Sequence, residues 1–253
     1  ELKLEKIKNT AKHFLTPKVL LRYSPGSMRE DQDSAKLNTL SAFSMNKSED
    51  KYNFEKGLSG SVGLNYKIKN NDKKEFDFSI AQVINEKENK KMSSKSSLDE
   101  KLSDLVGTTS YNLGNGINLK YDFAIDQNYS EFNYNELGLS VNNDLLKVDF
   151  SYLQEAKHIG NQEYFKTKID LKKDENGLLS FETKRDLIKN SSEFYKLSYE
   201  YINDCLRAGL VYRREFYIDS EVEPENSLMF KITLTPFGSI EPSIGKWLKK
   251  KLD

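Results

Sequence analysis

The chain has 253 residues, of which 31% are charged and 37% are hydrophobic, and its 39 basic side chains balance its 39 acidic ones. This balance excludes the positive excess that binding to a nucleic-acid backbone requires. The 14 tyrosines and 14 phenylalanines supply enough apolar surface for a folded chain. No stretch approaches the roughly 18 uncharged apolar residues that a membrane-spanning helix needs, which excludes spanning by helices but not by strands.

The chain starts with Glu1, and no basic stretch followed by an apolar one precedes the first patterned segment. We therefore expect the sequence to be a fragment or a processed chain. Residues 1–13 form an upstream segment for which the sequence predicts no definite structure.

From residue 14 onward, apolar side chains recur at every second position. In the clearest case they are Ile117, Leu119, Tyr121, Phe123 and Ile125, with Asn118, Lys120 and Asp122 between them. Since successive side chains of a strand point to opposite faces, this alternation predicts β-structure. We expect almost no helix and about twelve strands, near 14–24, 57–69, 73–88, 102–113, 116–128, 131–142, 144–157, 163–174, 177–189, 192–203, 205–218 and 226–237.

Most of these segments have about 11–15 residues, which corresponds to roughly 35–50 Å of extended chain. Strands of soluble proteins usually end after about five or six residues. A tilted strand that crosses a bilayer needs roughly 9–11 residues and continues beyond the membrane. The strand lengths therefore favour a membrane protein.

The connections between the predicted strands alternate in length. Every second connection is a tight turn of residues that hairpins prefer, namely Asn70-Asn71-Asp72, Gly114-Asn115, Asn142-Asn143, Glu175-Asn176 and Asn203-Asp204. The other set contains all the long connections, near 25–56, 89–101, 158–162 and 219–225. In an up-and-down meander this puts short turns at one end and long loops at the other, as in outer-membrane barrels, whose short turns are periplasmic and long loops extracellular.

The composition of the two faces of the predicted sheet also favours a membrane barrel. One carries Tyr, Phe, Leu, Ile and Val, and the other carries Lys, Asp, Glu and Arg in mid-strand, which a polar lumen accepts and a packed core does not. We predict an all-β fold, the antiparallel up-and-down transmembrane β-barrel portion of about twelve strands, with Leu119, Tyr121, Phe123, Leu146 and Phe150 facing lipid. A single-layer soluble sheet with one wet face is the alternative.

The sequence gives no sign of an enzyme. His13 and His158 are far apart and have no cysteine or paired carboxylates at ligand spacing, so we predict no metal site. Ser103-Asp104 lacks a glycine-framed nucleophile turn. Gly114-Asn115-Gly116 lacks the following helix and lysine of a phosphate-binding loop. We therefore predict no catalytic residue and no cofactor.

Residues 239–253 form a basic C-terminal tail. Its segment from Ile244 to Leu252 carries the only tryptophan, Trp247, and four lysines. Such a segment either lies on a membrane surface or is a solvated, frayed terminus, and both interpretations stay open.

Several segments, read in order, carry a resemblance to a known family. They are Leu15-Thr16-Pro17 leading to Leu21-Arg22-Tyr23-Ser24-Pro25, then Ser103-Asp104-Leu105-Val106-Gly107, Arg185-Asp186-Leu187, and Tyr201-Ile202-Asn203-Asp204-Cys205 continuing to Tyr212-Arg213-Arg214-Glu215-Phe216. Together they resemble the C-terminal half of the LptD family, the lipopolysaccharide (LPS) assembly or organic solvent tolerance proteins of the bacterial outer membrane. The stretch 201–216 is the most specific, and the resemblance spans most of 14–238.

The resemblance implies that residues 14–238 are about half of a larger barrel that inserts LPS into the outer leaflet through a lateral opening. It also implies an LptE-like lipoprotein plug in the lumen and a periplasmic LPS bridge that acts through an N-terminal domain. We expect that domain and the first half of the barrel to lie outside this sequence. A passive porin-type barrel is the main alternative function, and a soluble β-rich binding module is a further one.

Cys205 is the only cysteine and permits no internal disulfide. The alternation of connections puts the turn Asn203-Asp204 in the short, periplasmic set, where the compartment is oxidising. Many members of the LptD family carry two adjacent cysteines at this position, whereas Leu206 follows Cys205 in this chain. We expect a disulfide from Cys205 to a cysteine outside the fragment, with a buried free thiol as the alternative.

The resemblance also implies that the final barrel strand pairs with the first and that this junction opens sideways for the lipid. The predicted final strand, 228–237, presents Leu228, Phe230, Ile232 and Leu234 on one face. Pro236 near its end has no backbone N–H and removes one possible ladder hydrogen bond, which would weaken the junction. Alternatively, Pro236 merely ends the strand before the turn at Gly238.

Overall fold

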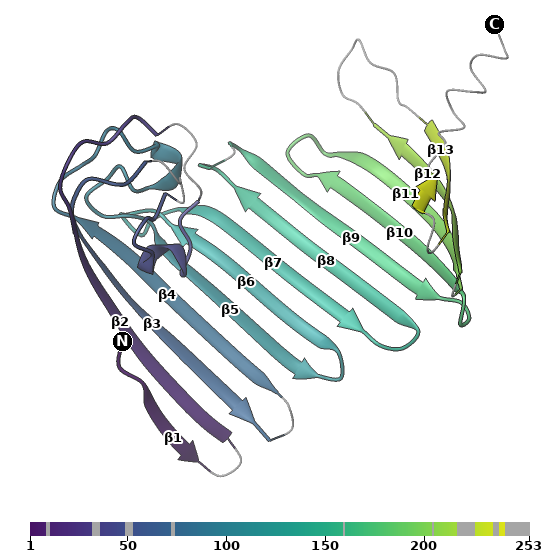
Figure 1. Ribbon diagram of the computed structural model, residues 1–253, viewed down its shortest axis with the longest axis horizontal. Coiled ribbons are helices and arrows are strands. Elements are labelled where there is room, and N and C mark those ends of the chain that lie inside the picture. The colour runs from purple at the N-terminus through teal and green to yellow at the C-terminus, as the bar shows by residue number, and fades with distance from the viewer. Residues whose placement is uncertain are drawn as a thin grey trace, which may run out of the picture. The chain divides into compact units, whose positions relative to one another are not determined.

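The computed structural model describes residues 1–8, 11–31, 36–48, 53–71, 74–158, 160–203, 205–216, 226–234 and 238–240. Among them are fourteen strands and two 3-10 helices of three residues each (Figure 1). No described helix has the length and apolarity needed to cross a membrane. The elements are β1 (Leu4–Lys8), β2 (Ala11–Ser24), η1 (Ser41–Phe43), β3 (Gly57–Asn70), β4 (Glu75–Asn85), η2 (Ser94–Ser96), β5 (Leu105–Gly114), β6 (Ile117–Ile125), β7 (Phe132–Asn142), β8 (Leu146–Glu155), β9 (Gln162–Lys172), β10 (Gly177–Asp186), β11 (Ser191–Ile202), β12 (Leu206–Glu215), β13 (Asn226–Leu234) and β14 (Gly238–Ile240).

The strands pair in chain order from β1 to β14, and the pairs whose registers are defined are antiparallel. This confirms the prediction of an all-β, up-and-down meander. Each of the twelve predicted strands is present, and most of their ends agree within about three residues. The sequence did not predict β1 and β14, because five and three residues are too few for an alternating pattern to stand out. Residues 1–13 thus hold β1 and the start of β2.

Contacts divide the chain into two compact units. Unit 1 comprises Glu1–Gly138 and Leu153–Gln162, and unit 2 comprises Leu139–Tyr152 and Glu163–Asp253. Each unit is described below by itself.

In unit 1, the pairing registers collect the apolar side chains on one face. Pro17 of β2 pairs with Leu64 of β3, which pairs with Ile80 of β4, so the three lie side by side on this apolar face. Farther along β2, Val19, Leu21 and Tyr23 are more than 70% exposed. In the described part of the chain no second sheet covers them, and a patch of this kind is stable only against another apolar phase. The lipid-facing assignment of the apolar side chains accounts for their exposure.

The opposite, polar face carries charges that neutralise each other. In unit 1, the Nζ of Lys120 lies 2.6 Å from a carboxylate oxygen of Asp122, and Lys67 pairs with both Glu75 and Asp77. In unit 2, the pairs are Lys147–Asp149 at 3.2 Å, Lys166–Glu182 at 2.8 Å and Lys168–Asp170 at 2.9 Å. These mid-strand charges are stable on this face because each of the named side chains has a counter-charge.

Three short turns of unit 2 lie in a row. Asn143, Asp174 and Asn203 each accept hydrogen bonds from two backbone N–H groups of their own turn. The turns are adjacent because Lys172 N donates to Leu145 O (2.8 Å) and Ile202 N donates to Asn176 O (2.7 Å). The tight connections predicted at these places are therefore confirmed, and each is closed by its own side chain.

The C-terminal part differs from expectation at one point. The short β14 follows β13 and pairs with it at Ile232, Thr233 and Leu234, so β13 is not the last strand. Pro236, the connection 219–225 and the tail from 241 to 253 lie outside the described residues.

Candidate functional site

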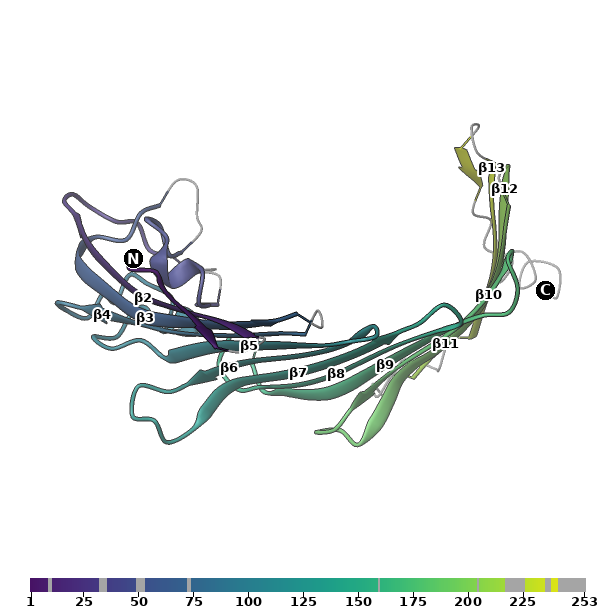
Figure 2. The same ribbon diagram turned by 90° about the horizontal axis from the view of Figure 1, so that it is seen from below.

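The two long connections of unit 1 pack on each other. They are residues 25–56, between β2 and β3, and 86–104, between β4 and β5, and their described residues are called the loop cap (Figure 2). Asp31 N donates to Lys91 O (2.8 Å), and the Nζ of Lys91 donates to Met28 O (2.9 Å). The prediction that these loops share one end of the strands is confirmed.

The cap has its own hydrophobic cluster, which lies on the polar face of the sheet. Val83 of β4 pairs with Ser61 of β3, on the face opposite the apolar one. Its side chain is fully buried beneath the cap. The cluster joins both loops to three strands, and its buried members are Met28, Leu37, Ala42, Ala81, Val83, Met92, Leu98, Val106 and Ala124. Because the buried residues on the strand side are only alanine and valine, the loops approach the sheet closely there.

Phe43 of η1 shows how close this approach is. It packs against the cluster and lies over Gly63 of β3, where an added Cβ would come within 2.9 Å of its ring and 2.4 Å of Ile80 O. Only glycine leaves room for the ring at this position. The Nζ of Lys18 lies 5.8 Å from the centre of the same ring.

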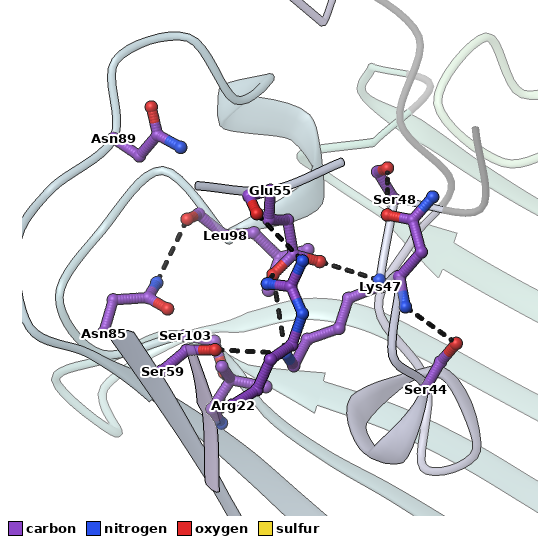
Figure 3. Close-up of polar contacts among 12 residues, drawn as sticks. Arg22, Ser44, Lys47, Ser48, Glu55, Ser59, Asn85, Asn89, Leu98 and Ser103 are labelled. Atoms are coloured by element: carbon purple, nitrogen blue, oxygen red, sulfur yellow. Dashed lines mark hydrogen bonds and ion pairs between the residues drawn. The ribbon is translucent and has the colours of Figure 1, made fainter. Parts of the chain in front are cut away.

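A buried ion network fastens the cap to β2 and β3 (Figure 3). The carboxylate of Glu55 lies 3.4 Å from both Arg22 Nη1 and Lys47 Nζ, and the three side chains are only 7%, 5% and 0% exposed. Arg22 Nη2 also donates to Glu55 O (2.8 Å), Lys47 N donates to Glu55 Oε1 (2.7 Å), and Lys47 Nζ donates to Ser59 Oγ (3.3 Å). Two cations thus depend on one carboxylate.

Burial lowers the pKa of Lys47 from its ordinary value, and the charge of Glu55 opposes this shift. Without Glu55, two positive charges would stay buried without compensation, which proteins tolerate poorly. Glu55 is therefore the residue on which the closed cap depends most.

Lys36 ties the first loop to the polar face of β6–β8. Its Nζ lies over the ring of Tyr134, and Glu136, Asp122 and Glu155 attract its charge. Burial nevertheless lowers the pKa of Lys36 from 10.5 to about 8, because the loss of water outweighs these carboxylates.

Ser103 and Asp104 close the second loop where it enters β5. Ser103 Oγ accepts from Val83 N (2.9 Å) and donates to Asp104 O (2.9 Å). Asn133 donates to Asp104 (2.9 Å), and burial raises the pKa of this carboxyl. These contacts fix the point where the second loop enters β5.

Of the residues singled out from the sequence, Cys205 is exposed and lies in the tight turn between β11 and β12. Leu228, Phe230, Ile232 and Leu234 lie on β13 and pair with the apolar residues Tyr212, Leu210, Ala208 and Leu206 of β12. Since Leu234 pairs with Leu206, the end of β13 is next to the turn that holds Cys205. Neither Cys205 nor β13 belongs to the cap.

His13 and His158 do not form a site. His13 Nδ1 lies 2.8 Å from the hydroxyl of Tyr66 on the apolar face, and His158 lies in the connection after β8. Over the described ranges, no three His, Cys, Asp or Glu side chains are placed to hold a metal ion.

Sequence reasoning missed the ion network. Arg22, Lys47 and Glu55 are separated by up to 33 residues, and nothing in the loop sequence distinguishes two of them from neighbouring charges. The only sequence feature that could have indicated the network is Arg22, a charged residue near the end of a strand whose other face is apolar.

Comparisons with known proteins give one family match. The family model described as "LPS transport system D" (LptD) matches residues 2–186, which include the loop cap. No curated protein matches the chain. Among solved structures, a triple mutant of the porin of Rhodopseudomonas blastica is 9% identical, with a TM-score of 0.44, over 73% of this chain and 84% of the porin. A double mutant of the same porin is 10% identical, also with a TM-score of 0.44, over 77% and 90% of the two chains.

Proposed function

Because the chain belongs to the LptD family, LPS transport system D, we propose that it forms part of a translocon that inserts LPS into the outer leaflet through a laterally opening barrel. The family places the protein in the outer membrane of Gram-negative bacteria. The observation that carries the proposal is the match over residues 2–186, which coincides with β1–β10 of the meander.

The two faces of the sheet suit this task. The apolar face meets lipid, and the ion-paired polar face lines an aqueous interior that a charged saccharide can enter. The loop cap lies on the polar face of unit 1 and narrows the interior beside β3–β5. A lipid whose head is polar and whose tails are apolar therefore has to leave sideways, between two strands.

We assign the lateral opening to the junction between the C-terminal strands and the first strand of the barrel. Among the described residues, β14 pairs with β13 at Ile232, Thr233 and Leu234, which is a short ladder for a strand of nine residues. A junction with few ladder hydrogen bonds opens at a lower cost, since each contributes about 1 kcal/mol.

A reversible crosslink tests this assignment. In the full-length protein, a cysteine in place of Met229 of β13 and a second one in the first barrel strand should form a disulfide that stops LPS delivery and leaves assembly intact. Reduction should restore delivery. The matched control is Thr167→Cys with Thr183→Cys, which join paired positions of β9 and β10 inside the sheet. Normal delivery with the junction crosslinked would eliminate the gate.

We further propose that Cys205 forms a disulfide with a cysteine elsewhere in the full-length protein, on the periplasmic side. The thiol is exposed in a turn that hydrogen bonds to Asn203 hold in place, so a partner can reach it. Non-reducing electrophoresis of membrane-inserted protein should show Cys205 bridged. A thiol that a maleimide alkylates completely would contradict this proposal.

We propose that an LptE-like lipoprotein occupies the lumen and that an N-terminal domain of the full-length protein receives LPS from the periplasmic bridge. Copurification of the full-length protein with such a lipoprotein tests the first of these.

A further inference from the structure

A pocket of about 640 Å³ lies in the loop cap, between the two long connections. Its wall is rich in lysine, and its lining residues are Ser27, Met28, Lys56, Lys87, Glu88, Asn89, Lys90, Lys91 and Lys101. Five lysines thus face one glutamate in a chain whose charges balance overall. Pockets of this volume hold ligands much larger than a water molecule or a single ion.

These lysines differ from those of the polar face. There, lysines such as Lys166 and Lys168 lie within 3 Å of a carboxylate. In the pocket, only Lys87 has a carboxylate neighbour among the described residues, Glu86 at 3.9 Å, and both side chains are more than half exposed. The pocket therefore keeps a positive charge that its own protein does not neutralise.

The pocket wall is fixed by hydrogen bonds from both loops. The side chain of Asn89 donates to Met28 Sδ (3.3 Å), and Asn89 N donates to Asp99 O (2.8 Å). Asn85 N of β4 donates to Lys101 O (2.7 Å), which holds that lysine at the end of the sheet. The backbone that carries the lysines is thus held in place before any ligand arrives, which lowers part of the entropy cost of binding.

We propose that this basic pocket binds the phosphorylated saccharide of LPS on the outer side of the membrane. The inference rests on the proposed function, since it needs the long connections to be extracellular. Lysine ammonium groups bind phosphate as point charges and do not need the paired geometry of a guanidinium, so a cluster of them suits a saccharide with several phosphates. Glu88 offsets only part of the positive field of the five lysines.

The test uses the double variant Lys90→Gln and Lys101→Gln in the full-length protein. Both side chains are exposed, and neither has a hydrogen bond or ion pair within the described residues, so the cap should stay folded. The control is Lys172→Gln with Lys173→Gln, which removes two exposed lysines at the short turn after β9. The probe is deacylated LPS, the water-soluble phosphorylated saccharide, titrated by calorimetry.

We expect the affinity to fall roughly 25-fold in the pocket variant, which corresponds to about fivefold for each lysine, and to stay within about twofold in the control. Equal affinity of the pocket variant and the unchanged protein would overturn the site. Equal binding of the saccharide after phosphatase treatment would overturn the phosphate assignment. Inorganic phosphate that binds as tightly as the saccharide would overturn the assignment to LPS.

Delivery of LPS, measured on the same variants, separates this inference from the proposed function. A protein that delivers LPS but binds the saccharide equally with and without Lys90 and Lys101 refutes the pocket and leaves the transport proposal standing. A protein that binds the saccharide through these lysines but delivers no LPS refutes the transport proposal instead.

Discussion

The loop cap and the three short turns of unit 2 solve the same problem, the reversal of chain direction between antiparallel strands, in opposite ways. Each short turn is closed by one side chain that accepts from its own backbone, as Asn143, Asp174 and Asn203 do. The cap uses a hydrophobic cluster, buried ions and contacts between residues more than 60 positions apart. The turns only need to reverse the chain, whereas the cap builds a surface.

The difference appears in the energetics. When the capping side chain of a turn is removed, the turn loses at most a few hydrogen bonds. Water then bonds to the freed backbone N–H groups, so the loss of stability is small. The cap contains buried charges that water does not solvate. Removal of one partner therefore leaves the other charges uncompensated, and the free energy of unfolding falls by the cost of their burial. The two kinds of connection should therefore respond differently to single substitutions.

The largest effect is expected for Glu55→Gln. This change keeps the shape of the side chain but leaves Arg22 and Lys47 buried without a counter-charge, at a cost of about 3–5 kcal/mol. Limited proteolysis of the full-length protein should then cut within 25–56, and the cap should open before the strands separate. Glu86→Gln is the control, because its pair with Lys87 is exposed and contributes less than about 1 kcal/mol. Equal proteolysis of the two variants would contradict a structural network.

A smaller effect is expected for Gly63→Ala. The added methyl group would displace the ring of Phe43 and press on Ile80 O, which should destabilise the cap by about 1–3 kcal/mol. Gly107→Ala is the comparison, because the atoms nearest to its methyl group would belong to the side-chain ring of Phe123, on the apolar face. The first variant should increase proteolysis of the cap and the second should not. The reverse result would place Phe43 outside the cap core.

A change of pH should act on the cap through Lys36. Since its pKa is about 8 in the folded protein and about 10.5 when exposed, the unfolded loop binds more protons between these values. The stability of this contact should therefore rise as the pH rises from about 8 to 10.5, and the gain should be lost as the pH falls through 8. Hydrogen exchange near residue 36 measures it. Lys36→Met should remove this dependence, and an unchanged dependence in the variant would assign it to another group.

The smallest effect is expected in a short turn. Asn203→Ala removes the acceptor for Cys205 N and Leu206 N and should cost about 1 kcal/mol, without any effect on proteolysis of the cap. Asn176→Ala is the control, since its side chain makes no hydrogen bond in the described part of the chain. Thermal denaturation in detergent compares the two. A larger loss of thermal stability for Asn203→Ala than for Glu55→Gln would contradict the claim that the cap depends more on single side chains than the short turns do.

The strands could be predicted because their signal is local. Most have about ten residues in which apolar and polar side chains alternate, as from Ile117 to Ile125, and the tight turns carry Asn, Asp or Gly. The same logic fails for β14, whose three residues form a strand only through their pairing with β13. Its existence depends on a neighbour that no sequence window contains.

The cap could not be predicted beyond its location. Glu55 is one of 39 acidic residues, and only the fold brings it to Arg22, which is 33 positions earlier. The basic pocket combines Lys56 with Lys101 in the same way, across β3 and β4. Sites that consist of contacts between distant loops leave no periodic pattern, and the alternation of connection lengths is their only trace.

Accessibility of single cysteines in living cells tests most directly the claim that the loop cap is extracellular and the short turns are periplasmic. The two variants of the full-length protein are Lys90→Cys, in the cap, and Lys173→Cys, in the turn after β9, each compared with the unchanged protein to account for Cys205. A membrane-impermeant maleimide should label Lys90→Cys on intact cells, and it should label Lys173→Cys only after the outer membrane is permeabilised. Labelling of Lys173→Cys but not of Lys90→Cys on intact cells would contradict the orientation, the basic pocket and the site proposed for Cys205 together.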